Sequence, residues 1–300
     1  MNSSLPQTSI PRKSATLDLW IRAVGGRSLW LITALGFAFI YIPIFILVIY
    51  SFNLSRTSGL WTGFTTNWYT SLWQGATSQS PDISTTLIWD ALRNSLIVGS
   101  ISTFFATTLG TMLAIALERF KFRGKALLEA LVFLPIIIPE ITMGISLLVF
   151  FSLVFQLIQN LTGIRLVLGL PTVIIGHITF NISFVVVTVR ARLGEIDPCL
   201  EEAALDLGAN EWKTLQRIIL PLIAPSIFSA GLLAFTLSLD DFVITFFTNG
   251  VGSTTLPVFV YGMIRLSITP AINAISTLML IASLGLVISS LSLQQATNQK

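Results

Sequence analysis

Charged residues are scarce in this chain of 300 residues. Lys, Arg, Asp and Glu make up 10% of the sequence, hydrophobic residues make up 53%, and the mean hydropathy is +0.83. A soluble domain carries about 25% charged residues. This composition cannot cover a water-soluble fold with polar groups, so it indicates an integral membrane protein.

Cysteine and histidine each occur once, as Cys199 and His177. One cysteine excludes an intrachain disulfide, and the lack of Cys and His clusters excludes the common zinc motifs. His177 lies inside an apolar segment, where a lone histidine more often bonds a neighbouring helix than acts in catalysis. We therefore expect neither a catalytic residue nor a metal site.

A phosphate-binding loop of the form Gly-x-x-x-x-Gly-Lys-Ser/Thr is also missing from the sequence. The only Gly-Lys pair, Gly124-Lys125, is followed by alanine in a basic turn. The chain is therefore not expected to hydrolyse a nucleotide or to bind a cofactor. If it drives uphill transport, the energy must come from another polypeptide or from an ion gradient.

Six apolar segments are long enough to cross a bilayer, for which a helix needs about 20 residues. They cover residues 29–52, 91–117, 126–158, 168–190, 222–248 and 272–294. The third is too long for one straight crossing, and we expect Pro135, Pro139 and Gly144 to break or tilt it. The first is too long for a cleaved signal peptide and is expected to remain as an anchor. The predicted fold class is an all-α membrane protein with six transmembrane helices.

Basic residues concentrate on one side of these spans. Thirteen of the 17 Lys and Arg residues precede the first span, follow the sixth, or lie in the second-to-third or fourth-to-fifth connection; the other four are Arg56, Arg93, Arg165 and Arg265. The positive-inside rule therefore predicts that both termini and the 193–221 hairpin are cytoplasmic.

The same pattern predicts the organisation of the chain. Residues 1–28 form a cytoplasmic N-terminal segment, in which 16–28 is either a short interfacial helix or a basic lead-in. Residues 29–90 hold the first anchor and the longest outer loop. The other five spans and the hairpin fill 91–294, and 295–300 form a cytoplasmic tail.

Three carboxylates, Glu140, Asp240 and Asp241, lie inside apolar spans that contain no Lys or Arg. An Asp at the bilayer centre costs about 2.5–3.5 kcal/mol, so such residues normally face a bundle interior or a watery cavity. Glu140 follows Pro139 and could instead begin a restarted helix. Asp240 and Asp241 are separated by about 100° around a helix, so one is expected to face a pathway and the other a neighbouring helix.

Aromatic residues gather in the outer loop, among them Trp61, Trp68 and Tyr69. Such a cluster often marks the aromatic belt at a membrane surface. The alternative is that some of the rings bind an organic cation through their π faces. The sequence leaves both interpretations open.

The 193–221 segment combines acidic and apolar residues at helical spacing, and Gly208 is expected to divide it into two short helices. A surface of this kind fits the binding of a helix in a protein groove, although a solvated connector would look similar. Its residues Glu202-Ala203-Ala204, then three residues, Gly208, nine residues and Ile218-x-Leu220-Pro221 resemble the signature of membrane subunits of ATP-binding-cassette (ABC) importers.

That resemblance implies a type I importer permease fold, in which Glu202, Ala203, Ala204, Leu205 and Gly208 form the coupling loop that docks on an ATPase. The implied partners are a second, similar permease, an ATPase dimer that carries ATP and Mg²⁺ and contacts 200–212, and an external solute-binding protein. The implied location is the inner membrane of a bacterium, with the lipid bilayer as surroundings and no nucleic acid bound.

Further matches at 60–69, 119–125, 177–180 and 235–241 resemble the second membrane subunit of spermidine/putrescine importers, although that protein is expected to have Asp where this chain has Glu140. The resemblance implies a polyamine pathway through Trp61, Trp68, Tyr69, Glu140, Asp240 and Asp241. Another small solute, such as an amino-acid-like compound or a metal chelate, is the alternative within this class. An ion-coupled carrier or a non-transporting scaffold are alternatives outside it.

Overall fold

The computed structural model describes the backbone of residues 13–55, 60–74, 85–266 and 270–298. Six helical segments among these residues are long and apolar enough to cross a membrane: Ser28–Tyr50, Leu87–Arg119, Glu140–Thr162, Leu170–Gly194, Glu211–Asp240 and Ala271–Ser292. Each overlaps one predicted span, so the prediction of an all-α fold with six spans is confirmed.

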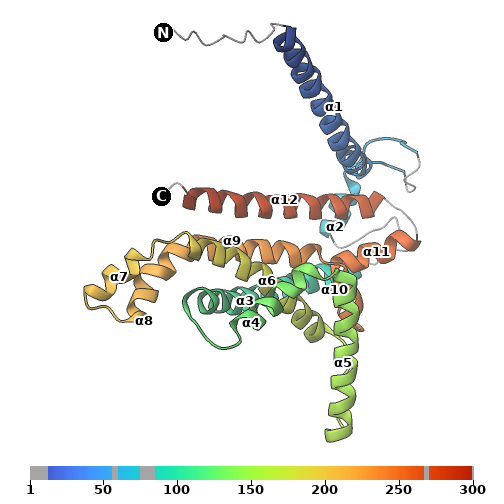
Figure 1. Cartoon of the computed structure of the whole chain (residues 1–300). Helices are drawn as coiled ribbons and strands as arrows, with labels where there is room; N and C mark the ends of the chain where they lie inside the picture. The colour runs from blue at the N-terminus through green and yellow to red at the C-terminus, as the bar shows by residue number, and fades with distance from the viewer. Residues whose placement is uncertain (1–12, 56–59, 75–84, 267–269, 299–300) are drawn as a thin grey trace, which may run out of the picture.

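The elements in chain order are α1 (Lys13–Tyr50), α2 (Asn67–Gln74), α3 (Thr85–Arg119), α4 (Lys125–Ile137), α5 (Glu140–Thr162), α6 (Leu170–Gly194), α7 (Cys199–Asp206), α8 (Glu211–Thr214), a π-helical turn (Leu215–Ile219), α9 (Leu220–Asp240), α10 (Val243–Thr248), α11 (Leu256–Leu266) and α12 (Pro270–Asn298). Figure 1 shows α12 lying along α9, α7 and α8 at one end of the bundle, and α1 and α5 projecting from it.

The packed core consists of α3, α6 and α9. Small residues let these helices approach closely. Gly110 of α3 faces α6 so tightly that a Cβ atom there would lie 2.7 Å from Val185 Cγ1 and 3.2 Å from the Ile182 carbonyl oxygen. Leu117, Leu193 and Ile223 are fully buried around this contact region. These three helices therefore form the rigid body on which the other elements rest.

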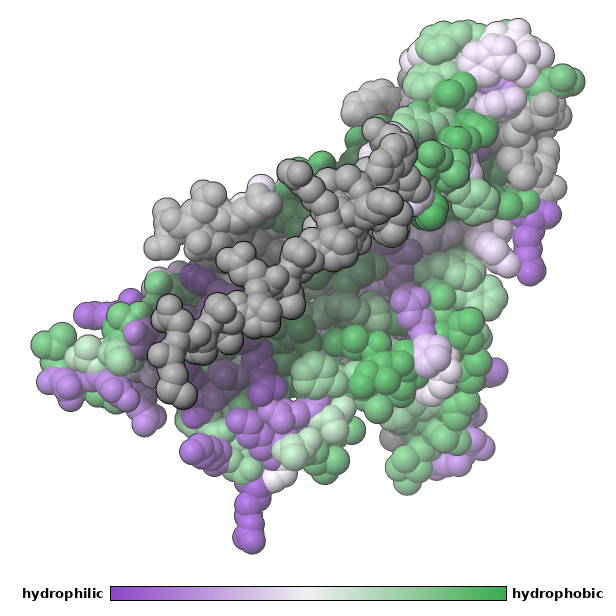
Figure 2. Space-filling view, turned by 45° about the horizontal axis from the view of Figure 1, so that its top comes forward, coloured by the Kyte–Doolittle hydropathy of each residue, from purple (hydrophilic) through white to green (hydrophobic). Residues whose placement is uncertain are grey.

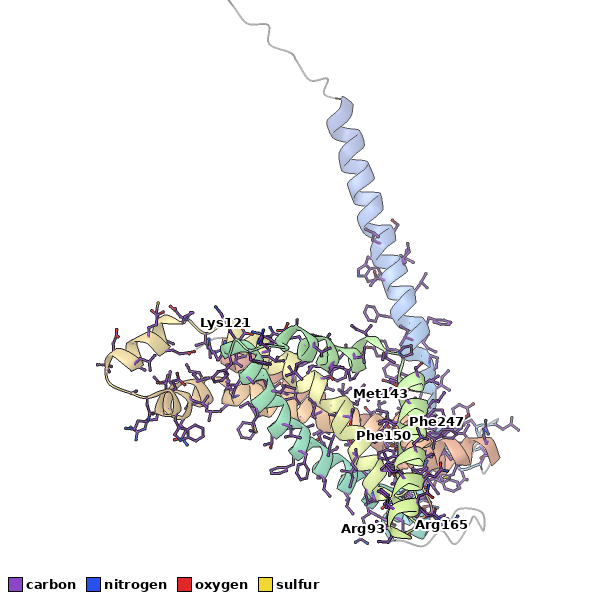
Figure 3. All side chains as sticks on the ribbon, turned by 60° about the horizontal axis from the view of Figure 1, so that its bottom comes forward. Arg93, Lys121, Met143, Phe150, Arg165 and Phe247 are labelled. Carbon is purple, nitrogen blue, oxygen red and sulfur yellow. The ribbon has the colours of Figure 1, made fainter. Side chains whose placement is uncertain are left out.

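The third predicted span is two helices, because α4 ends at Ile137 and α5 begins at Glu140. Pro139 lies in the break, as predicted, whereas Pro135 is inside the last turn of α4 and Gly144 is inside α5, so neither breaks a helix. Gly144 serves packing instead, because a Cβ atom there would lie 2.6 Å from the Phe247 ring. Figure 3 shows Met143 and Phe247 near this junction.

The prediction of one helix over 222–248 is wrong. Helix α9 ends at Asp240, Asp241 is extended with φ −64° and ψ 124°, and α10 begins at Val243. At the other end of the chain, residues 16–28 continue into the first span as part of α1, and residues 1–12 lie outside the described residues.

Two helices have little protein around them. The membrane-spanning part of α1 has no buried residues, and in α5 only Met143, Gly144 and Phe151 are buried. Their exposed residues are mostly large and apolar, such as Phe39, Leu153 and Leu161. Figure 2 shows hydrophilic residues gathered mainly toward the end that carries the α7–α8 hairpin. The apolar faces of α1 and α5 therefore need lipid or another protein as cover.

Gly110→Ala is expected to destabilise the bundle by about 1–3 kcal/mol, because the added methyl group overpacks the contact between α3 and α6. The measurement is the thermal unfolding midpoint of the purified chain in detergent. Gly285→Ala on α12 is the matched control, since a Cβ atom there meets nothing within 4 Å. Equal midpoints for the two variants would contradict the packing argument.

Candidate functional site

The α7–α8 hairpin is built by local signals. Gly208 has φ +83°, a left-handed conformation that suits glycine, and the amides of Gly208 and Ala209 donate to the carbonyls of Leu205 and Ala204. The Asn210 side chain then accepts a 2.8 Å bond from the Lys213 amide and caps α8. The prediction that Gly208 separates two short helices is confirmed.

The hairpin presents one face to the bundle and one face outward. Ala204 is buried, whereas Glu202, Ala203 and Leu205 are exposed. Large apolar side chains are exposed beside them, with Leu207 at 89% and Trp212 at 62%. An exposed apolar surface with carboxylates on a rigid turn is the kind of surface that marks a protein-binding site.

One ion pair anchors the hairpin to the bundle, and two more join the bundle helices beside it. Arg119, the last residue of α3, lies 2.5 Å from Glu201 of α7, and both side chains are about three-quarters buried. Arg190 of α6 contacts Glu118 of α3 and Glu129 of α4, each at 2.8 Å. Glu201 therefore faces the protein while its neighbour Glu202 faces away from it.

The hairpin begins with a hydrogen-bonded turn. Asp197 Oδ1 accepts a 2.9 Å bond from the Cys199 amide, and this bond lowers the pKa of the carboxyl group. In return, the hydrogen bond and the negative charge of Asp197 raise the pKa of the Cys199 thiol. Cys199 is exposed, so its reactivity reports on the first turn of α7.

Asp241 lies in a buried polar network, with a side chain 6% exposed. Its carboxylate accepts bonds from the amides of Ile244 and Thr245 at the start of α10, at 3.3 and 2.9 Å, and from the Thr245 hydroxyl at 3.1 Å. His177 Nε2 is 3.2 Å from the same carboxylate. Asp241 therefore caps α10 and binds α6.

His177 is 1% exposed and both its ring nitrogens have partners. Nδ1 is 2.6 Å from Ser238 Oγ, and Nε2 is 2.9 Å from Thr245 Oγ1. Ser238 Oγ in turn lies 3.2 Å from Ser102 Oγ of α3. The prediction that His177 bonds neighbouring helices is confirmed. Its connection to Asp241 and Ser238 was missed, because nothing in the sequence pairs these positions.

Asp240, the neighbour of Asp241, is exposed, and its Oδ1 accepts a 2.8 Å bond from Ser283 of α12. Glu140 is exposed as well, at the first position of α5. Ile138 and Met143, on either side of Glu140, pack in one cluster with Leu237 and Ile244. Glu140 and Leu237, which precedes Asp240 by three residues, thus both adjoin this cluster or belong to it, while the Asp241 carboxylate is buried and hydrogen-bonded.

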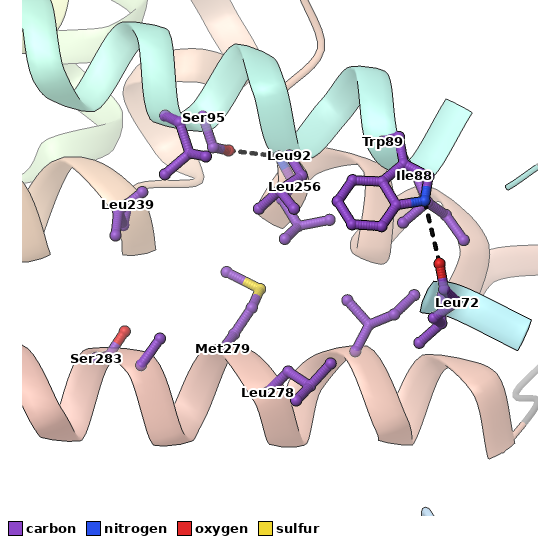
Figure 4. Close-up of a pocket in the computed structure, with 13 residues that line it drawn as sticks. Leu72, Ile88, Trp89, Leu92, Ser95, Leu239, Leu256, Leu278, Met279 and Ser283 are labelled. Carbon is purple, nitrogen blue, oxygen red and sulfur yellow. Dashed lines mark hydrogen bonds between the residues drawn. The ribbon is translucent and has the colours of Figure 1, made fainter. Parts of the chain in front are cut away.

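An apolar pocket of about 250 Å³ lies between α3, α9, α11 and α12 (Figure 4). Its lining includes Leu239, Met279 and Ser283, and Ser283 is the residue that bonds Asp240. A carboxylate thus lies beside a hydrophobic chamber. Such a combination suits a ligand with a cationic end and an apolar chain.

The loop aromatics pack in a cluster that borders this pocket and shares residues such as Leu72 and Leu256 with it. Trp68 is buried and donates from Nε1 to the Asn53 carbonyl, and the Tyr69 hydroxyl lies 2.6 Å from Ser51 Oγ. Both rings belong to a cluster with α11 and α12, so they hold the loop onto the bundle. Trp61 is half-exposed and packs edge-to-face on Tyr50. The structure does not gather these three rings around the acids.

Residues 106–300 match the model of the family described as binding-protein-dependent transport system inner membrane component. The chain is 41% identical over 254 residues to the spermidine/putrescine transport system permease protein PotC of Escherichia coli (strain K12), which covers 85% of this chain and 89% of PotC. It is 40% identical over 264 residues to the putrescine transport system permease protein PotI of the same organism, with 87% and 89% covered.

The fold is also similar to a solved structure. A chain in the crystal structure of a bacterial ABC transporter involved in the import of the acidic polysaccharide alginate superimposes with a TM-score of 0.70. The match covers 95% of this chain and 99% of that chain at 18% identity. At this level of identity the likeness concerns the fold alone, which is that of an ABC importer permease.

Asp197→Asn is expected to speed the reaction of Cys199 with maleimide at pH 8. Asn removes the negative charge that raises the pKa of the thiol, so the pKa falls and more thiolate is present at a given pH. The measurement is the pH–rate profile of labelling, whose midpoint should move to lower pH. Glu195→Gln is the control, because Glu195 bonds Arg192 instead. An unchanged midpoint would contradict the assignment.

Proposed function

The chain belongs to the family of binding-protein-dependent transport system inner membrane components, and from this we propose that it is the permease subunit of an ATP-driven polyamine importer. The observation that carries the proposal is the 41% identity to PotC over most of both chains. The chain is a multi-pass inner-membrane protein. Its membership of this family argues against the alternative function of an ion-coupled carrier.

The hairpin is proposed to receive the ATPase. Glu202, Leu205 and Trp212 present a carboxylate and apolar groups outward, while Ala204 and Glu201 root the hairpin in the bundle. A basic residue on the partner would pair with Glu202, and apolar groups would cover Leu205 and Trp212. ATP and Mg²⁺ would be held by that partner, whose closure would push the hairpin.

The orientation of the chain in the membrane follows from this proposal. The hairpin, both termini and the basic turn at 119–125 would face the cytoplasm. Figure 3 places Lys121 toward the hairpin end and both Arg93 and Arg165 toward the opposite end of the bundle. An external solute-binding protein would deliver the solute at that opposite end, and a second permease would cover the apolar face of α5.

The pathway is proposed to pass Glu140 and Asp240. Each ammonium group of a polyamine would be compensated by one of these exposed carboxylates, and the methylene segments would find apolar cover in the pocket beside Asp240. Asp241 would contribute indirectly, since its carboxylate is occupied by α10 and His177. Trp61 would remain available as an exposed ring at the entrance.

Glu202→Arg is expected to lower co-purification of the ATPase about tenfold, because like charges would then face each other in the docked surface. The measurement is the ratio of ATPase to permease after affinity purification in mild detergent. Asp90→Arg is the matched control, as an exposed acid on α3, away from the hairpin. Full ATPase retention by Glu202→Arg and by a deletion of 200–212 would refute the docking site.

Asp240→Asn and Glu140→Gln are each expected to reduce polyamine uptake about five- to tenfold, the effect of losing one charge-assisted contact. Complex yield should stay at the parental level, because both side chains are exposed. Asp241→Asn should instead lower the yield, since its carboxylate is a buried cap. Uptake into vesicles with a controlled amount of complex distinguishes these outcomes. Parental uptake by both exposed-acid variants would refute the pathway.

A further inference from the structure

The break between α9 and α10 occurs without proline or glycine. Helix kinks usually occur at proline, at glycine or where a side chain enters the backbone ladder. The segment from Ser238 to Thr245 contains neither proline nor glycine. Its only departure from helix is at Asp241 and Phe242, where the Asp241 carboxylate takes the first amides of α10. A side chain therefore makes this break.

The Asp241 carboxylate can hold that position only while hydrogen-bond donors face it. Its side chain is 6% exposed, and a buried unpaired carboxylate is strongly unfavourable. His177 Nε2 lies 3.2 Å from this carboxylate, and hydrogen bonds link the two residues through Thr245. With the proton on Nε2, His177 donates to Thr245, Thr245 donates to Asp241, and Ser238 donates to Nδ1.

The network also fixes where α10 lies. Thr172 of α6 donates a 2.6 Å bond to the Thr248 carbonyl at the last turn of α10. Gly176, next to His177, accepts Ile244 so closely that a Cβ atom would lie 2.8 Å from its Cγ2. Helix α10 is thus bound to α6 at its start, middle and end.

We propose that His177 is a positioning residue for Asp240. By holding Asp241 to α6, it fixes the break that ends α9 at Asp240 and turns this carboxylate toward Ser283 and the exposed side. If α9 continued without a break, Asp240 would be followed by another helical turn and would no longer be the last residue of the helix. The inference rests on the proposed function only in giving Asp240 contact with the solute; the positioning itself is a statement about geometry.

The test measures accessibility without any solute. A cysteine at 240, in a chain with Cys199→Ser, is labelled by a cationic methanethiosulfonate in the assembled complex. We expect His177→Leu to slow this labelling about tenfold, since it removes the partner of a buried carboxylate. His177→Gln should stay within about twofold of the parent, because its amide can both donate and accept.

A smaller change tests the same network in case His177→Leu does not fold. Thr245→Val keeps the side-chain shape but removes the hydroxyl between His177 and Asp241, and should slow labelling about threefold, in line with one hydrogen bond. Ser229→Ala is the matched control, because Ser229 is a buried α9 serine that bonds Ser290 outside the network. A cysteine at the exposed position Arg165, in the connection between α5 and α6, controls for reagent access.

The outcomes separate the two proposals. Parental labelling at 240 in assembled His177→Leu and Thr245→Val complexes would overturn the positioning role, whatever happens to uptake. Slow labelling in these variants, with rescue by Gln, supports it. In uptake assays with the native Asp240, His177→Leu should raise the apparent KM while His177→Gln does not. If Asp240→Asn transports normally, the pathway proposal fails while the labelling result still decides the role of His177.

Discussion

A helix that ends within an apolar layer leaves amide and carbonyl groups that water cannot reach, and each must find a partner within the protein. This chain ends helices inside two of its apolar spans, at Ile137 and at Asp240. At the first, Pro139 removes one amide and a new helix begins at Glu140. At the second, Asp241 supplies a carboxylate to the new helix, and the side chains of Thr245 and His177 lie against that carboxylate. The positions of the exposed acids follow from how these two ends are satisfied.

Two pairs of adjacent acids, one in the hairpin and one at the end of α9, each combine an acid that contacts the protein with an acid that is exposed. Glu201 pairs with Arg119 while Glu202 is exposed, just as Asp241 is buried while Asp240 is exposed. In each pair one acid holds the element in place and the adjacent acid remains available for a partner. Adjacent helical residues point in directions about 100° apart, which separates Glu201 from Glu202, whereas the extended backbone at Asp241 separates its side chain from that of Asp240.

Hydropathy and local capping signals were enough to predict the six spans and the two helices of the hairpin. The six spans follow from apolar runs, and the division of the hairpin follows from Gly208, whose left-handed backbone needs no distant contact. The break after Asp240 coincides with a local cap, since Asp241 accepts from amides three and four residues ahead. The contact of Asp241 with His177 could not be predicted, because His177 lies in another span. The packing of Trp68 and Tyr69 could not be predicted either, because these rings pack against α11 and α12, which lie near the end of the chain.

Helix α5 has few buried residues, so a copy of the chain without its neighbours differs from an assembled one. A copy without its neighbours would hold Glu140 and a long apolar face against lipid tails, which solvate the apolar groups but not the carboxylate. Surplus copies would thus differ from assembled ones in a feature that membrane quality control can recognise.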